Sequence, residues 1–225
     1  MTVLHLADET EAADLAAFLS RLLHYDRGAA VRLQAAGTAL AVFGRPPSFE
    51  VLAVRAVRLA KPYENGLDVT LDVTVSAGEF LESVDERAAT AAVPAAVTGP
   101  PWAGVLPPRG GWQAEPGLPA PDALRATVAA AVAEFRSRTE ELAPDGRSRA
   151  ELDRIGRDIW SREIGRTGLP VRAVHAAQSL GFLRPGVGPA DTGLFSSGAW
   201  LRLRTPYGSV AVRRTGLGSL GVTVR

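Results

Sequence analysis

Few side chains in this sequence have the types and spacing that catalysis requires. The histidines are His5, His24 and His175, and none has a His or carboxylate partner at the spacing of a metal-binding motif. A lone histidine is usually a hydrogen-bonded surface or core residue rather than a ligand. Cysteine is absent, which excludes thiol catalysis, disulfides and Cys-ligated zinc.

Carboxylates and serines offer two further chemistries. Glu79, Glu82, Asp85 and Glu86 could hold Mg²⁺ or act as a general acid and base, but the same spacing is typical of a solvated acidic face, which we favour. The serine pair at 196–197 lacks the Gly-x-Ser-x-Gly elbow of a serine hydrolase. We therefore expect no catalytic residue, although an enzyme whose site is assembled from distant residues is left open.

Nucleotide cofactors are not predicted either. Residues 216–221 match Gly-x-Gly-x-x-Gly by letter, but a dinucleotide site needs a helix to begin there, and only four residues follow. A glycine-rich turn is the expected structure. No P-loop occurs, and the sole lysine, Lys61, lies outside any glycine-rich loop. The sequence thus predicts no cofactor and no metal.

Arginine and tryptophan near the C-terminal end favour partner binding instead. Strands are predicted at residues 200–204 and 209–213, joined by the Thr-Pro-Tyr-Gly turn at 205–208. In that register one side of the hairpin is apolar, with Leu201 facing Val212, and the other side carries Arg and Trp. The candidate partner-binding residues are Trp200, Arg202, Arg204, Arg213, Arg214, Arg172 and His175.

Two classes of binding protein fit these residues. The first is a protein-interaction module that docks an acidic protein surface, or this chain's own acidic half, because Trp and Arg most often anchor such contacts. Self-association through the unpaired edge of the hairpin is also expected. The alternative is a winged-helix DNA-binding protein in which Arg172, His175 and Ser179 face the groove and the hairpin arginines contact phosphates. We favour protein over DNA because the third helix carries few base-reading side chains.

The elements before residue 93 predict an α+β unit. A strand at 3–7 precedes a helix that begins with a capping box at Asp8 and Glu11 and buries an apolar stripe until Gly28. Strands follow at 31–33, 40–42, 49–59 and 67–75, and the Asn-Gly pair at 65–66 predicts a tight reversal between the last two. We expect the helix to pack on an antiparallel sheet, followed by a short acidic helix at 76–87.

Residues 93–119 form a Pro/Gly-rich connector between this α+β unit at 1–92 and a helical region at 120–225. Because Trp102 and Trp112 lie in the connector, we expect it to pack against the protein. Three helices are predicted next, at 121–142, 148–160 and 170–180, and they precede the hairpin and a closing strand at 220–224.

Composition and charge are those of a soluble globular protein. The 225 residues are 46% hydrophobic and 22% charged, with a net charge of +1. Residues 1–144 carry 12 basic and 18 acidic side chains, and residues 145–225 carry 13 and 6. Such asymmetry indicates either an anionic partner for the basic part or attraction between the two parts. With no signal peptide and no bilayer-spanning apolar run, we expect a cytoplasmic protein that does not bind membranes.

Two stretches of the chain resemble a family of uncharacterised actinobacterial proteins. One runs from Gly99-Pro100-Pro101 to the Pro-Pro-Arg-Gly-Gly-Trp segment at 107–112, where the family has Ser in place of Gly110. The other is the helix ending in Leu-Gly-Phe-Leu at 180–183 ahead of the Trp-Leu-Arg-Leu strand at 200–203. The resemblance covers about half of the chain and implies a cytoplasmic bacterial origin, with no activity, cofactor or catalytic residue attached to it.

Overall fold

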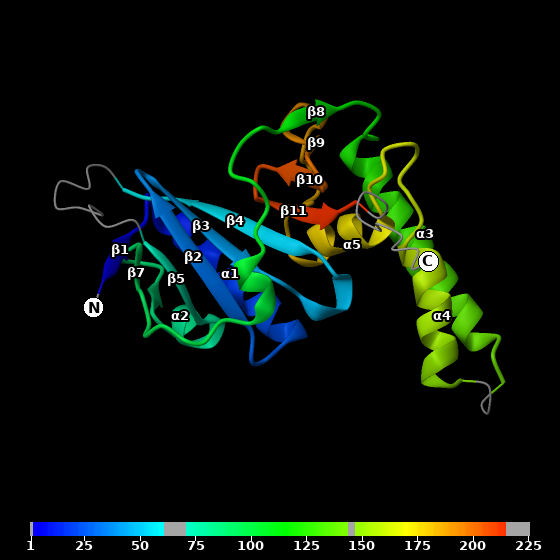
Figure 1. Cartoon of the computed structure of the whole chain (residues 1–225), viewed down its shortest axis with the longest axis horizontal. Helices are drawn as coiled ribbons and strands as arrows, with labels where there is room; N and C mark the ends of the chain where they lie inside the picture. The colour runs from blue at the N-terminus through cyan, green and yellow to red at the C-terminus, as the bar shows by residue number, and fades with distance from the viewer. Residues whose placement is uncertain (1, 61–70, 144–146, 215–225) are drawn as a thin grey trace, which may run out of the picture.

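The computed structural model describes residues 2–60, 71–143 and 147–214, and within them the chain is a mixed α+β protein, as predicted (Figure 1). The predicted Asn-Gly reversal at 65–66, the glycine-rich turn at 216–221 and the closing strand at 220–224 lie outside the described residues.

One antiparallel sheet of eight strands runs through both halves of the chain. Its order is β5-β2-β3-β4-β11-β10-β9-β8. The two halves meet where β4 pairs with β11, with Val54 opposite Ser209. The strands are β2 (Ala30–Ala36), β3 (Ala39–Gly44), β4 (Leu52–Arg58), β5 (Asp72–Ser76), β8 (Gln113–Glu115), β9 (Gly193–Ser197), β10 (Trp200–Thr205) and β11 (Gly208–Arg213).

A second, smaller sheet lies beside one end of the large one. It has the order β1-β7-β6, from β1 (Val3–His5), β7 (Thr90–Ala92) and β6 (Val84–Asp85). A bridge between Leu6 and Leu59 connects it to the end of β4. The predicted acidic helix at 76–87 is shorter than expected: α2 (Ala77–Glu82) ends at the Ser83 cap, and β6 follows directly.

Helices cover one face of the large sheet, which we call the inner face. The helix α1 (Glu9–Tyr25) packs on β4, and α5 (Val171–Ser179) packs on β10 and β11. The helices α3 (Pro121–Glu140) and α4 (Arg149–Trp160) lie side by side at one end of the molecule, and α3 also contacts α5. Short 3₁₀ turns occur at η1 (Pro47–Phe49), η2 (Pro101–Gly104) and η4 (Pro189–Asp191).

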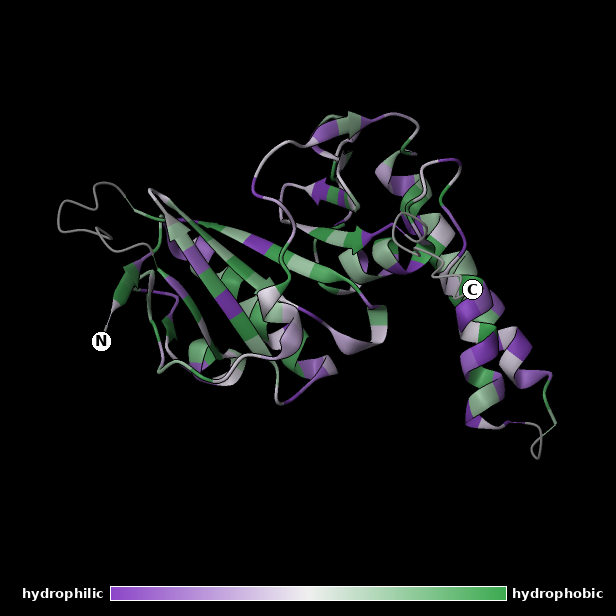
Figure 2. Ribbon diagram, viewed as in Figure 1, coloured by the Kyte–Doolittle hydropathy of each residue, from purple (hydrophilic) through white to green (hydrophobic). Residues whose placement is uncertain are grey.

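The hydrophobic core lies between the inner face and these helices, and it joins both halves of the chain. Leu33 and Leu40 from the first half and Leu203 and Val210 from the second are fully buried in the same cluster. Figure 2 shows the corresponding alternation of apolar and polar residues along the strands. Successive side chains of a strand point to opposite faces of the sheet, so a sheet with one covered face alternates between apolar and polar residues.

The C-terminal hairpin has the predicted register. Trp200 lies opposite Arg213, Leu201 opposite Val212, and Arg204 opposite Ser209. Its edge is not free, however, because β11 pairs with β4 and β10 pairs with β9. The expected self-association through this edge is therefore wrong as a mechanism, since the backbone groups it needed are already used within the sheet.

The predicted pairing of the strands at 49–59 and 67–75 is also wrong. The strand β5 pairs with β2, with Val75 opposite Val31, at the edge of the sheet away from β11. An Asn-Gly pair signals a local hairpin, but β4 pairs instead with β3 and with the distant strand β11. Because β11 lies far along the chain from β4, the residues around β4 carry no local sequence signal for this pairing.

Candidate functional site

The face of the large sheet opposite α1 and α5, which we call the outer face, carries most of the predicted binding residues. Trp200, Arg202, Arg204 and Arg213 share this face, as the hairpin register requires. Arg204 and Arg213 are exposed, and Trp200 and Arg202 are half-buried. The prediction that the hairpin arginines share one side is confirmed for these three arginines.

Arg214 does not belong to that group. It follows Arg213 and points to the other side, where it pairs with Glu115 of β8 at 2.6 Å. Hydrogen bonds from Ser196 and from Arg214 lower the pKa of the Glu115 carboxyl below its ordinary value. Arg214 thus connects the end of the hairpin to β8, the edge strand beyond β9.

Arg172 and His175 lie apart from the outer face, on α5. Arg172 reaches Glu50 at 3.7 Å, and the ring of His175 stacks on Trp160 at 4.8 Å and meets Phe49 edge-on. Burial lowers the pKa of His175, so the folded chain holds this ring neutral. The winged-helix alternative needed these side chains to project from an exposed recognition helix, whereas α5 packs against the sheet and against α3, and both side chains are half-buried.

The Pro/Gly-rich connector crosses the outer face as a strap, which we define as residues 97–112. Trp102 and Leu106 pack on Phe43, Leu52 and Val54 in a second, small hydrophobic cluster. In Figure 1 the strap passes in front of the N-terminal strands and continues into β8. The expectation that the connector packs against the protein is confirmed, and both of its tryptophans are half-buried.

Polar contacts hold the strap at three places. The Val97 amide donates to the Thr74 carbonyl at 2.9 Å, and the Arg32 guanidinium donates to the Ala103 carbonyl. Arg32 also forms an ion pair with Asp72, whose pKa it lowers. Further along, the Ser197 hydroxyl of β9 donates to the Gly110 carbonyl at 3.3 Å. Within the strap, the Trp112 indole N–H donates to the Pro108 carbonyl at 3.0 Å.

The strap leaves a pocket on its β11 side, which we call the Trp pocket. It encloses about 340 Å³. Its apolar walls include Trp102, Val105 and Trp200. Val105 is 47% exposed, one of few large apolar side chains in the described residues that face solvent to this degree. The full lining is Arg45, Glu50, Val51, Leu52, Pro101, Trp102, Val105, Trp200, Ala211, Val212 and Arg213.

A second pocket lies on the other side of the strap, which we call the Arg202 pocket. It encloses about 230 Å³ between the strap and strands β2 to β4. Arg202 and Arg109 are the charged residues that line it. The other lining residues are Gln34, Ala35, Ala39, Phe43, Val54, Pro107 and Pro108.

The outer-face arginines contact aromatic rings rather than carboxylates. Arg213 lies over Trp200 at 5.4 Å from the ring centre, Arg204 over Phe195 at 4.7 Å, and Arg202 over Trp112 at 5.6 Å. Within residues 2–60, 71–143 and 147–214, no Asp or Glu forms an ion pair with any of these three arginines. Their charge is therefore available to a partner.

Arg45, Trp102 and Val105 belong to the candidate face but were not predicted for it. The two tryptophans of the connector were a signal that this segment packs on the protein, but nothing in the sequence indicated where. Arg45 comes just after β3, and this loop brings it into the lining of the same pocket as Arg213. Sequence reasoning therefore found the strand residues of the face and missed those that the strap and loops bring.

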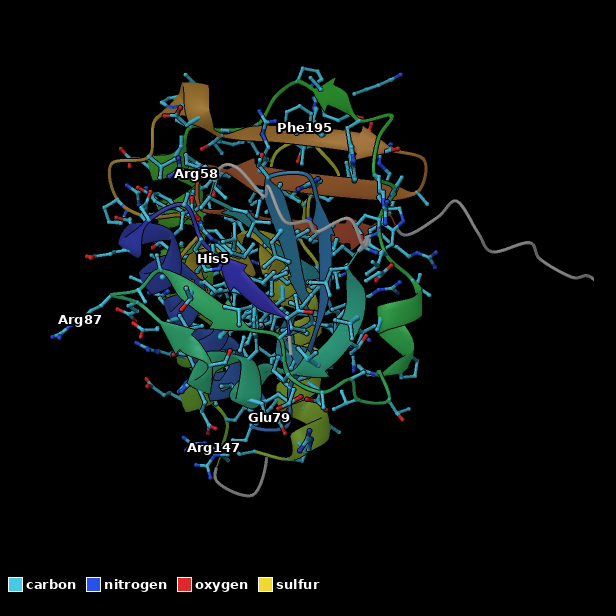
Figure 3. All side chains as sticks on the ribbon, turned by 90° about the vertical axis from the view of Figure 1, so that its left-hand side faces the viewer. His5, Arg58, Glu79, Arg87, Arg147 and Phe195 are labelled. Carbon is cyan, nitrogen blue, oxygen red and sulfur yellow. The ribbon has the colours of Figure 1, made fainter. Side chains whose placement is uncertain are left out.

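The side chains first weighed for catalysis remain scattered. His5 lies on β1 and His24 on α1, while the serines at 196–197 lie on β9. Figure 3 shows the same separation, with His5 toward the viewer and Phe195 of β9 at the top. Among the described residues, no group of three or more His, Asp or Glu side chains is arranged to hold a metal ion.

The largest buried charge cluster lies on the inner face, away from the pockets. Arg55 of β4 donates to Glu11 at 2.8 Å and to the Tyr207 carbonyl at 2.7 Å. Asp14 lies between Arg55 at 3.5 Å and Arg184 at 2.7 Å. These contacts join α1 and β4 to the second half of the chain, as the opposite charges of the two halves suggested.

Two family models match the chain. Residues 1–104 match the model described as Domain of unknown function (DUF8010), and residues 107–217 match the one described as Domain of unknown function (DUF8185). Together they cover nearly the whole chain, in keeping with an uncharacterised family. No curated protein and no solved structure matches it. Across the part of the chain that the structure describes, no helix has the length and apolar character needed to cross a membrane.

Proposed function

We propose that this chain is a binding protein, without catalytic activity of its own, that docks an acidic segment of another protein on the outer face. The observation that carries the proposal is the Trp pocket, whose lining combines apolar side chains of the strap and of β10 with Arg45 and Arg213. A half-buried aromatic centre with an arginine rim is the usual composition of a protein-binding hot spot.

The charge of this face supports an acidic partner. Arg204 and Arg213 have no carboxylate partner among the described residues, and the one carboxylate in the lining of the Trp pocket, Glu50, is also within 3.7 Å of Arg172. Unpaired arginines steer an oppositely charged partner toward the surface and select against basic ones. An acidic segment with one apolar side chain would place that side chain between Trp102 and Trp200.

Fluorescence anisotropy tests the proposal with short labelled peptides in which one Phe is flanked by Asp and Glu. We expect them to bind, and we expect Arg213→Glu to weaken binding about tenfold or more, because a contact between charged groups is replaced by repulsion. Arg87→Glu is the matched control, since Arg87 is exposed in the turn between β6 and β7 and points away from the molecule (Figure 3). It changes the net charge equally and should bind as the unaltered chain does.

Three companion probes distinguish this proposal from the alternatives. Peptides with Asn and Gln in place of Asp and Glu, or with Gly in place of Phe, should bind poorly if both charge and the apolar side chain matter. Random-sequence duplex DNA should bind no better to the unaltered chain than to Arg213→Glu. Equal peptide binding by both charge-reversal variants, or DNA binding that depends on Arg213, would overturn the proposal.

A further inference from the structure

The Arg202 pocket contains a cation that the protein itself leaves uncompensated. Arg202 is half-buried, and its Nε donates to the Ser209 hydroxyl at 2.8 Å. Its two terminal nitrogens have no hydrogen bond to any residue that the structure describes. Burial, and to a lesser extent the charge of Arg204, lowers the pKa of Arg202. A guanidinium remains ionised under such a shift, and with no carboxylate paired to it among the described residues, an anion is the ligand that Arg202 would favour.

The rest of this pocket is apolar apart from one amide and one more cation. Phe43, Val54 and Pro107 form its walls, and Arg109 stands at its rim with its side chain exposed. The charge of Arg109 contributes to lowering the pKa of Asp72, but Asp72 is already bonded by Arg32 and by Gln34. Among the residues that the structure describes, no Asp or Glu lines the pocket.

The strap holds the guanidinium of Arg202 in place. The Trp112 ring lies against it, and the Trp112 N–H is fixed to the Pro108 carbonyl. On the opposite side, the Ser209 hydroxyl sets the orientation of the Arg202 Nε. A cation held from two sides presents its remaining N–H groups in a fixed direction, which is the arrangement that binds a carboxylate with two parallel hydrogen bonds.

We propose that the Arg202 pocket binds a small aliphatic monocarboxylic acid, with the carboxylate on Arg202 and the hydrocarbon chain against Phe43 and Val54. Arg109 adds a second positive charge at the mouth. The enclosed volume of about 230 Å³ is below the range typical of sites for drug-sized ligands, so the ligand is small. This site is distinct from the Trp pocket and does not depend on the acidic protein partner.

Isothermal titration calorimetry at neutral pH tests the proposal with hexanoate as the probe and with hexanol and hexylamine as matched compounds. We expect hexanoate to bind and the other two to bind at least about tenfold more weakly, because each lacks the anion that Arg202 requires. Arg202→Gln should lose about tenfold or more in hexanoate affinity. Arg87→Gln is the control, since Arg87 is exposed in the turn between β6 and β7 and does not line the pocket.

Other results would overturn the proposal. If hexanol bound as tightly as hexanoate, the pocket would be an apolar hollow with no anion site. An equal loss of affinity in Arg202→Gln and Arg87→Gln would indicate a general charge effect. If Arg202→Gln does not fold, Arg109→Gln provides the test, because an exposed side chain can be changed safely and its loss should still weaken hexanoate. Displacement of the acidic peptides by hexanoate would assign the pocket to a side chain of the protein partner, and an absence of hexanoate binding would remove the site.

Discussion

At the scale of single residues, Arg55 connects the two halves of the chain, and Glu11 of the first half compensates its charge. Both are nearly fully buried, and Arg55 also holds the carbonyl of Tyr207 in the turn of the C-terminal hairpin. A buried ion pair is not strongly stabilising in itself, but removing one partner leaves an uncompensated buried charge. Glu11 is therefore expected to be sensitive to substitution.

We expect Glu11→Gln to lower the free energy of unfolding by about 2–4 kcal/mol, since Arg55 and Arg58 both lose their charged acceptor. Urea unfolding measures this change. Glu9→Gln is the control, because Glu9 lies in the same first turn of α1 but is exposed. Similar losses from the two substitutions would contradict the structural role assigned to Glu11.

The hydrogen-bond partners of Glu11 could be predicted from the sequence only in part. The Asp8 side chain accepts a hydrogen bond from the Glu11 amide at 2.9 Å, as the capping signature predicts. The returning half of the capping box is absent, because the Glu11 carboxylate bonds Arg55 and Arg58 instead. Both arginines lie more than 40 residues along the chain, so no local pattern could have identified them.

At the scale of elements, the C-terminal hairpin is the part that local sequence specified best. Its turn chemistry and its alternation of apolar and polar residues determine the register, and both are local properties. Gly208 closes the turn with a φ of +153°, and a Cβ placed there would lie 2.5 Å from the ring of Phe182. Phe182 is buried in the core and cannot move aside freely.

Gly208→Ala is accordingly expected to destabilise the chain by about 2 kcal/mol or more, through overpacking against Phe182 and backbone strain. The midpoint of thermal unfolding provides the measurement. Gly110→Ala should have little effect, because a Cβ at Gly110 meets no atom within 4 Å. If both alanines lowered the midpoint equally, the close contact with Phe182 would not be the cause.

The path of the strap and the position of β5 in the sheet could not be predicted from the sequences of these segments alone. The density of Pro and Gly predicted an irregular segment, and its tryptophans predicted packing, yet its path over β3 and β4 depends on the cluster of Trp102 with Phe43 and Val54. The edge position of β5 likewise depends on β11, which occupies the side of β4 that a local hairpin would have used. Contacts between segments far apart in the sequence therefore determine both the path of the strap and the edge position of β5.

At the scale of the whole molecule, the continuous sheet makes the two halves interdependent. The two matched family models meet between residues 104 and 107, within the strap, whereas the core and the β4–β11 pairing run across that junction. Residues 1–104 alone would expose the edge of β4 and leave Arg55 without Tyr207.

The full chain is therefore expected to unfold in one cooperative transition, despite its division into two family models. Scanning calorimetry should give a calorimetric enthalpy equal to the van't Hoff enthalpy. Two separate transitions, or a fragment of residues 1–104 that unfolds cooperatively by itself, would show that the shared sheet contributes little to stability.

The claim that matters most is that an acidic protein segment docks at the Trp pocket, and site-specific photocrosslinking tests it most directly. A benzoylphenylalanine replaces either Val105, which lines the pocket and is 47% exposed, or Val3 of β1, which is 43% exposed and lies on the smaller sheet. The account predicts that the Phe-containing acidic peptides crosslink to the chain labelled at 105, and that Arg213→Glu abolishes this product. Equal crosslinking at the two positions, or crosslinking at 105 that survives Arg213→Glu, would contradict it.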